Sequence, residues 1–94
     1  MIKFGIAGAT DNFYNTGHKT SLEVPAYLNG INLDAFEYQC GRGVNISAAL
    51  AQKLGEEANK HSITLTIHSP YYINIANPDE AKRKNSLRYI LQTL

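Results

Sequence analysis

The chain has 94 residues, enough for one small domain, and its 44% hydrophobic and 18% charged residues are a globular balance rather than a disordered one. A formal net charge of +1 gives no basic field of the kind typical of nucleic-acid-binding proteins, and the single cysteine excludes an internal disulfide. Because no signal-peptide run or stretch of ~18 apolar residues occurs, we expect a cytoplasmic protein with no membrane partner.

The first half of the chain predicts a strand, a loop, a short helix and a second strand. Residues 2–7 are mostly apolar, as in a strand buried on both faces, and residues 8–19 are polar and predict a long loop. Proline is best tolerated in the first turn of a helix, so Pro25 favours a helix over about residues 24–30. Residues 31–39 then form the second apolar segment.

The second half predicts a longer helix, a third strand and a last helix. Ser47 has the character of an N-cap for a helix over residues 48–61, and residues 63–68 contain good strand formers. Residues 69–76 form a loop. Residues 77–80 (Asn-Pro-Asp-Glu) are expected to open the last helix with an N-cap, a proline at the first position and two acids.

The order of these elements predicts a parallel sheet covered by helices, because each connection between strands has the length of a helix. A complete (β/α)8 barrel needs about 250 residues. We therefore expect an α/β fold in which residues 1–94 are the N-terminal portion of one TIM-barrel domain, its first three βα units. The sequence stops inside an apolar stripe of the last helix, which fits a partial barrel; the stripe consists of Leu87, Ile90, Leu91 and Leu94.

His68 is the candidate metal ligand. In an α/β barrel the functional face lies at the carboxyl ends of the strands, and His68 ends the third predicted strand. Its neutral imidazole suits zinc, copper or iron. The alternative is a histidine that only forms a local hydrogen bond.

Three further residues in the predicted loops are candidate contacts to a ligand. Tyr71 and Tyr72 could stack on bases or sugars, and Arg42 lies between two glycines, where its guanidinium could reach a phosphate. The alternatives are that at least one tyrosine packs beneath its own loop and that Arg42 is an ordinary surface arginine in a turn.

Other titratable groups predict no site. Cys40 has no evident base beside it and is expected to be a buried small hydrophobe, and His18 is expected in a solvated loop. A basic run in the last helix is expected to form a solvated face; it comprises Lys82, Arg83, Lys84 and Arg88.

Residues 67–75 (Ile-His-Ser-Pro-Tyr-Tyr-Ile-Asn-Ile) resemble the H-x-P-Y-x-I-N stretch of the endonuclease IV family of apurinic/apyrimidinic endonucleases. The resemblance extends, with gaps, over nearly the whole chain, but covers only about the first third of a family member. Residues 5–8 lack the histidine and serine that many members carry there, which indicates a divergent branch.

The resemblance implies a zinc-dependent barrel that cuts the DNA backbone 5′ to abasic sites. Three zinc ions, held by histidines and carboxylates, would activate a hydroxide and stabilise the transition state. By position, His68 matches the first zinc-binding histidine of the family. Tyr71 and Tyr72 match a loop that enters the minor groove of DNA beside the extruded nucleotide, and Arg42 matches an intruding arginine across a gap.

The remaining zinc ligands of the family lie on later strands, and a catalytic zinc needs about three protein ligands. We therefore expect the 94-residue chain alone to be inactive, with no catalytic residue beyond the metal ligand, and to self-associate through open sheet edges.

Two other functions remain open. One is a metal-dependent sugar isomerase or epimerase of the same barrel superfamily, which the near-neutral charge favours. The other is a small self-contained binding module in which His68 is structural.

Overall fold

A computed structural model describes residues 1–94, which form two compact units. Unit 1 comprises residues 1–38 and 46–66, and unit 2 comprises residues 39–45 and 67–94. None of the helices has the length and apolar character that crossing a membrane requires.

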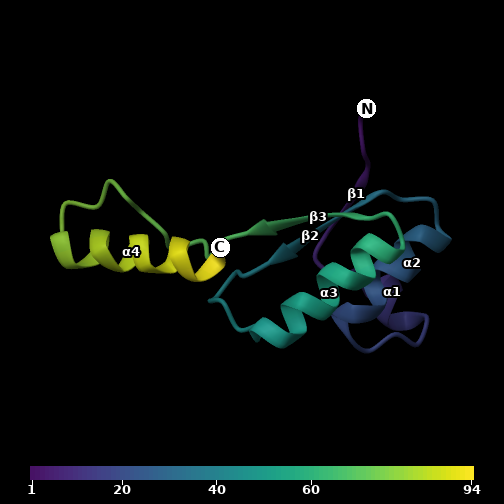
Figure 1. Cartoon of the computed structure of the whole chain (residues 1–94). Helices are drawn as coiled ribbons and strands as arrows, with labels where there is room; N and C mark the ends of the chain where they lie inside the picture. Colours follow the sequence, from purple (N-terminus) through teal and green to yellow (C-terminus); the bar gives the residue numbers. More distant parts are fainter. The chain divides into compact units, whose positions relative to one another are not determined.

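The three predicted strands form one sheet in the order β1-β2-β3 (Figure 1). Their bounds are Gly5–Ala7 for β1, Ala35–Gln39 for β2 and Thr64–His68 for β3. Gly5 of β1 pairs with Ala35 of β2 in parallel register. The Thr64 N–H donates to the Asp34 carbonyl at 2.8 Å and the Cys40 N–H to the His68 carbonyl at 2.9 Å, so residue numbers rise together along β2 and β3. The predicted α/β class with parallel strands is confirmed.

Four α-helices and one 3₁₀ segment connect and follow the strands. The helix predicted after Ser47 is confirmed: the Ser47 hydroxyl accepts the Leu50 N–H at 3.1 Å. The helix predicted around Pro25 is confirmed as well, with the 3₁₀ segment before it. The bounds are Asp11–Asn15 for α1, Ser21–Glu23 for the 3₁₀ segment η1, Val24–Gly30 for α2, Ala48–Lys60 for α3 and Glu80–Thr93 for α4.

The hydrophobic core lies in unit 1, where α2, α3 and residues of the strands meet. Phe13, Val24 and Leu28 are completely buried, and Phe36 of β2 is 2% exposed. The remaining buried members of this core are Leu54, Ala58 and Ile63. Leu54 and Ala58 lie four residues apart and are therefore on the same, buried face of α3.

The prediction that residues 8–19 form only a loop is wrong, because they contain α1. The Thr10 hydroxyl accepts the Phe13 N–H at 3.3 Å and caps this helix, and burial of the Phe13 side chain holds it on the core. A helix of five residues is too short to show a hydrophobic period in the sequence.

The loop around His18 is exposed as predicted, but the His18 ring itself is partly buried and packs on the core. The His18 ring stacks on Phe13 with centroids 4.8 Å apart, and its Nδ1 lies 3.6 Å from the Glu23 carboxylate. Glu23 accepts the backbone N–H groups of Lys19 at 2.7 Å and Thr20 at 2.9 Å. These two hydrogen bonds, with a smaller contribution from His18, hold the pKa of Glu23 below its ordinary value.

The first strand is not buried on both faces as predicted. Gly5 and Ala7 are exposed, and only Ile6 packs against the core. The reason is its place at the edge of the sheet, where β2 alone pairs with it.

The predicted start of the last helix is also two residues early. Asn77 is not its N-cap, because the Asn77 side-chain oxygen accepts the Asp79 N–H in a turn before the helix, and Asp79 caps the Lys82 N–H at 3.2 Å.

Gly5 is expected to tolerate no side chain, because a Cβ there would overlap the carbonyl oxygen of Ala35 on the paired strand. We predict that Gly5→Ala lowers the free energy of unfolding by about 1–3 kcal/mol. Gly55→Ala is the matched control: it lies inside α3 with open space around the new Cβ, and should raise stability by roughly 0.5–1 kcal/mol. Urea denaturation of both variants checks this, and equal effects would contradict it.

Candidate functional site

The candidate site residues all belong to unit 2: His68 is the last residue of β3, and Arg42, Tyr71 and Tyr72 lie in the loops that follow β2 and β3. The hydrogen bond from the Cys40 N–H to the His68 carbonyl joins the ends of the two strands at 2.9 Å. One step further, the Tyr71 N–H donates to the Gly41 carbonyl at 3.3 Å. Because parallel strands end at the same edge of a sheet, the structure brings His68, Arg42 and the two tyrosines into one region, as predicted.

His68 is exposed, and its imidazole is oriented by its own neighbour. Its Nδ1 lies 2.8 Å from the carbonyl oxygen of Ser69. A carbonyl oxygen can only accept, so Nδ1 carries the proton, and in the neutral ring Nε2 keeps its lone pair. Histidines that bind metals characteristically donate the other ring N–H to such an acceptor. The local hydrogen bond therefore leaves His68 able to act as a ligand.

The residues present fit one position of a metal site and not a whole site. No group of three or more histidine, cysteine, aspartate or glutamate side chains comes together in the structure. A catalytic zinc needs about three protein ligands, so the residues of this chain do not make up a catalytic zinc site by themselves.

Tyr71 and Tyr72 have different surroundings. Tyr71 is 75% exposed, whereas Tyr72 is 40% exposed and packs edge-to-face on Tyr89 of α4, with ring centroids 4.9 Å apart. The two neighbouring rings are also edge-to-face, at 5.5 Å. Tyr72 thus supports the loop, and Tyr71 presents its ring to solvent.

Arg42 lies in a tight turn that follows β2. The Gly43 N–H donates to the Cys40 carbonyl at 2.9 Å, and Gly43 has φ 144°, a conformation that favours glycine. The Tyr72 hydroxyl donates to the Arg42 carbonyl at 3.5 Å, so the backbone of Arg42 is held while its side chain is exposed. Cys40 is 3% exposed, as predicted, and this burial raises the pKa of its thiol.

Residues 69–79, between β3 and α4, contain Tyr71 and Tyr72 and are called the tyrosine loop below. Ser86 anchors this loop to α4, and it was not identified from the sequence. Its hydroxyl accepts the Asn74 N–H at 2.9 Å and donates to the Asn74 carbonyl at 3.3 Å. Ser86 is 4% exposed. The signal for it was present: Lys82, Asn85, Ser86 and Tyr89 follow a helical period and form one polar face of α4.

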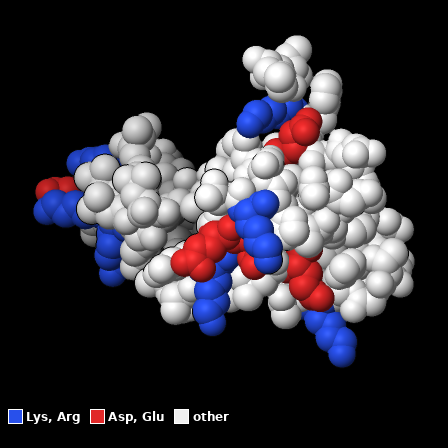
Figure 2. All heavy atoms as spheres, turned by 45° about the vertical axis from the view of Figure 1, so that its right-hand side comes forward, with Lys and Arg blue, Asp and Glu red and all other residues white.

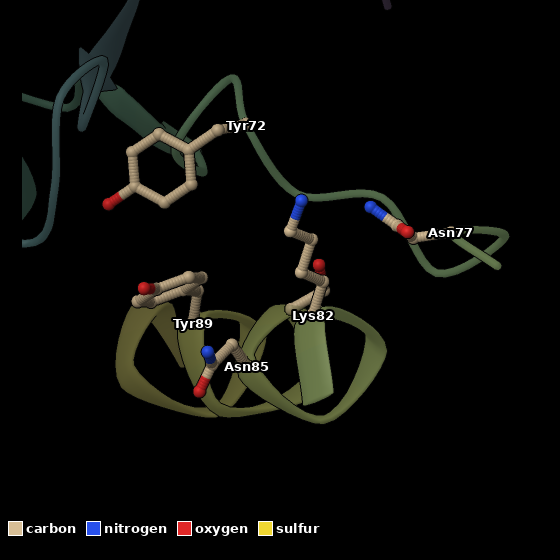
Figure 3. A pocket seen from close by; sticks show the side chains of 6 residues that line it. Tyr72, Asn77, Lys82, Asn85 and Tyr89 are labelled. Atoms are coloured by element: carbon tan, nitrogen blue, oxygen red, sulfur yellow. The ribbon is translucent and has the colours of Figure 1, made fainter. Parts of the chain in front are cut away.

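This polar face of α4 and the loop enclose a small pocket of about 190 Å³ (Figure 3). Figure 3 shows Tyr72 and Asn77 reaching into it from the loop, opposite Tyr89 and Lys82 of the helix. Its lining residues are Tyr72, Asn77, Lys82, Asn85, Ser86 and Tyr89.

Charge is divided unequally between the two units. Unit 2 contains five Lys and Arg residues and two Asp and Glu residues, for a formal charge of +3, whereas unit 1 contains four and six, for −2. On the face in view in Figure 2, acidic and basic side chains are interleaved over unit 1, whereas basic side chains predominate around α4. The net charge of +1 therefore conceals a basic unit that contains all four candidate residues.

Comparison with known proteins gives one family and one relative. Residues 25–94 match the family model described as xylose isomerase-like TIM barrel. An uncharacterized protein of Methanocaldococcus jannaschii is 34% identical to this chain over 97 residues. The alignment covers 99% of the chain and 32% of that protein, so the chain spans about a third of the length of the relative that it matches. No solved structure matches the chain significantly.

The hydrogen bonds of Ser86 are expected to determine the order of the tyrosine loop. Ser86→Ala removes both hydrogen bonds, each worth about 0.5–1.5 kcal/mol, and leaves the N–H and the carbonyl of the exposed Asn74 to water. We predict that amide hydrogen exchange at Asn74 and Ala76 becomes faster in this variant. Asn85→Ala, which alters the neighbouring position without removing a hydrogen bond to the loop, is the control. Unchanged exchange in Ser86→Ala would contradict the anchoring role.

Proposed function

The chain belongs to the xylose isomerase-like TIM barrel family, and on that premise we propose that it forms part of a zinc-dependent, endonuclease IV-like DNA repair enzyme. The reaction is hydrolysis of the phosphodiester bond 5′ to an abasic site in DNA. The family spans DNA-cleaving and sugar-converting barrels, so the choice between them rests on the candidate site.

The observation that carries this proposal is the pairing of a metal-competent His68 with an exposed Tyr71 three residues on. The Nδ1–H to Ser69 hydrogen bond leaves Nε2 of His68 free, and Tyr71 is 75% exposed on the loop that β3 leads into. In the proposed enzyme His68 is one zinc ligand, and Tyr71 contacts a base or fills the space beside the abasic nucleotide.

The charge of unit 2 supports a nucleic acid as the substrate. Binding to DNA is driven by neutralisation of phosphates, and the +3 charge accompanies the tyrosine loop and Arg42. The Arg42 carbonyl accepts the Tyr72 hydroxyl at 3.5 Å, and the exposed guanidinium of Arg42 can donate two hydrogen bonds to one phosphate.

When bound, the zinc ions supply a nucleophile at neutral pH and neutralise the charge that develops on the phosphate. The contribution of this chain is His68 as a ligand, with Ser69 fixing the orientation of the ring, and a loop that holds the DNA. No group of three or more histidine, cysteine, aspartate or glutamate side chains comes together in residues 1–94, so in the proposed enzyme the other ligands belong to further residues of the whole barrel.

The His68 ligand is tested in the protein that carries the whole barrel. We predict that this protein nicks a duplex with one abasic site and that a zinc chelator stops the reaction. His68→Ala should lower the rate at least tenfold and reduce bound zinc. The matched control is His61→Ala, which removes a histidine 3.5 Å from Glu57 at the end of α3 and should leave incision intact. Intact DNA in every condition would refute the proposed function.

Tyr71 is expected to act through the face of its ring. Tyr71→Ala should weaken binding to the abasic duplex roughly 5- to 100-fold, the loss of one stacking contact, whereas Tyr71→Phe keeps the ring and should bind within about twofold of the parent protein. Fluorescence anisotropy in the presence of a chelator measures binding without incision. Equal losses in both variants would assign the effect to the hydroxyl and contradict stacking.

The second candidate is a metal-dependent sugar isomerase or epimerase of the same family. The observation that favours it is the small polar pocket beside Tyr72, together with the low charge of the whole chain. In that enzyme Tyr71 and Tyr72 would pack on the sugar. Metal binding through His68 without incision of DNA would favour this function over the first.

A further inference from the structure

The pocket between the tyrosine loop and α4 is not part of the contacts proposed above for His68, Tyr71 and Arg42. It measures about 190 Å³, below the roughly 300–1,000 Å³ of pockets that enclose drug-sized molecules. Its six lining residues include one cation and no carboxylate. A small ligand that accepts hydrogen bonds is therefore the kind that fits.

Lys82 is the one cation of its neighbourhood whose charge is not already satisfied. Of the three consecutive basic residues in α4, Lys84 pairs with Glu80 at 3.1 Å, and Arg83 donates to the carbonyls of residues 77 and 78 at 2.8 and 3.1 Å. The Lys82 ammonium forms no ion pair or hydrogen bond with unit 2, and it lines the pocket. The nearby Asp79 carboxylate is used by the backbone N–H of Lys82 and does not line the pocket.

Asn77 adds a second free donor. Its side-chain oxygen accepts the Asp79 N–H at 2.9 Å, and this assigns the other end of the amide as the nitrogen, which has no protein acceptor. Figure 3 shows the side-chain nitrogens of Asn77 and Lys82 facing the same space under the loop. Three other polar groups of the pocket already have partners, because the Ser86 hydroxyl is bonded to Asn74, the Tyr72 hydroxyl to Arg42 and the Tyr89 hydroxyl to Arg88. The side-chain amide of Asn85 is a further group that can meet a ligand.

We propose that this pocket binds a phosphate group, held by the ammonium of Lys82 and the side-chain amide of Asn77. A phosphate presents several oxygens that accept charge-assisted hydrogen bonds. Its oxygens therefore match the two converging donors, and its negative charge matches the +3 charge of unit 2. Tyr72 lies at the edge of the same pocket and contacts Tyr71 edge-to-face. A phosphate bound here therefore belongs to the backbone of the strand that Tyr71 contacts, an assignment that rests on the proposed function.

The experiment compares two variants of α4, in each of which one lysine is replaced by the neutral glutamine, in the protein that carries the whole barrel. Lys82→Gln removes the proposed contact, and Lys84→Gln removes the same charge from an exposed residue paired with Glu80. A chelator is present throughout, so that binding to abasic duplex DNA is measured without incision. We expect Lys82→Gln to weaken binding roughly three- to tenfold and to lower the slope of log affinity against log salt by about 1. Lys84→Gln should change both less.

Asn77→Asp supplies a second variant that keeps the loop intact. The aspartate retains the oxygen that accepts the Asp79 N–H, while a donor is exchanged for a negative charge. We expect this variant to lose binding of inorganic phosphate, followed by the side-chain amide signals of residue 77 and its neighbours in NMR titration. Retained phosphate binding in both Lys82→Gln and Asn77→Asp overturns the site.

Two further arms separate the sources of the phosphate and separate this site from the proposed function. The parent protein is titrated with inorganic phosphate and with a sugar phosphate in competition with the duplex. Tighter binding of duplex than of either small molecule supports a backbone phosphate; tighter binding of the sugar phosphate overturns the DNA assignment. Phosphate binding that depends on Lys82, in a protein that never nicks abasic DNA, would refute the repair function and leave the phosphate site standing. Equal effects of Lys82→Gln and Lys84→Gln on every ligand would refute the site.

Discussion

The candidate site depends on the parallel pairing of β2 and β3, and above all on the hydrogen bond that closes their carboxyl ends. The hydrogen bond from the Cys40 N–H to the His68 carbonyl, at 2.9 Å, holds the ends of the two strands side by side, so that the Arg42 turn and the tyrosine loop begin next to each other. The next contacts, from the Tyr71 N–H to Gly41 and from the Tyr72 hydroxyl to Arg42, extend that pairing beyond the strands. An antiparallel arrangement would place the ends of these strands at opposite edges and separate His68 from Arg42.

The tyrosine loop combines exposure with order because it is anchored at two points by different means. β3 fixes the first end, and Ser86 of α4 fixes the middle of the loop through both backbone groups of Asn74. Tyr72 packs on Tyr89 and leaves Tyr71 as the exposed ring. A binding group that is already positioned loses less conformational entropy when it meets a ligand, which is why an exposed aromatic on an anchored loop is an effective contact.

The sequence predicted most of the fold and the positions of the candidate residues, and it failed where structure depends on single side-chain contacts. The strands and the helix after Ser47 have clear composition and capping signals, so they could be identified. α1 could not, because Phe13 alone buries it. In α4 the apolar stripe drew attention, yet Leu87 and Leu91 are exposed, and the polar face with Ser86 carries the loop. The helical period of these polar residues was visible in the sequence, but the hydrogen bonds from Ser86 to Asn74 are tertiary contacts that the sequence does not show.

The net charge of the chain is likewise less informative than the distribution of charges over its two units. A net charge of +1 indicated no nucleic-acid partner, but it is the sum of +3 on unit 2 and −2 on unit 1. Exposed charges separated by more than about 10 Å at 0.1 M salt are largely screened from each other, so a bound polyanion responds to the charges of the surface it touches and only weakly to the total. Within unit 2, Lys84 and Arg83 are already engaged by protein acceptors, and the Arg88 guanidinium donates to the Tyr89 hydroxyl at 3.5 Å. Arg42 and Lys82 have no such side-chain partner. The cations left for a ligand are thus the two that flank the tyrosine loop, one on the turn after β2 and one on the polar face of α4. That distribution favours an extended phosphate-bearing ligand over a compact neutral sugar.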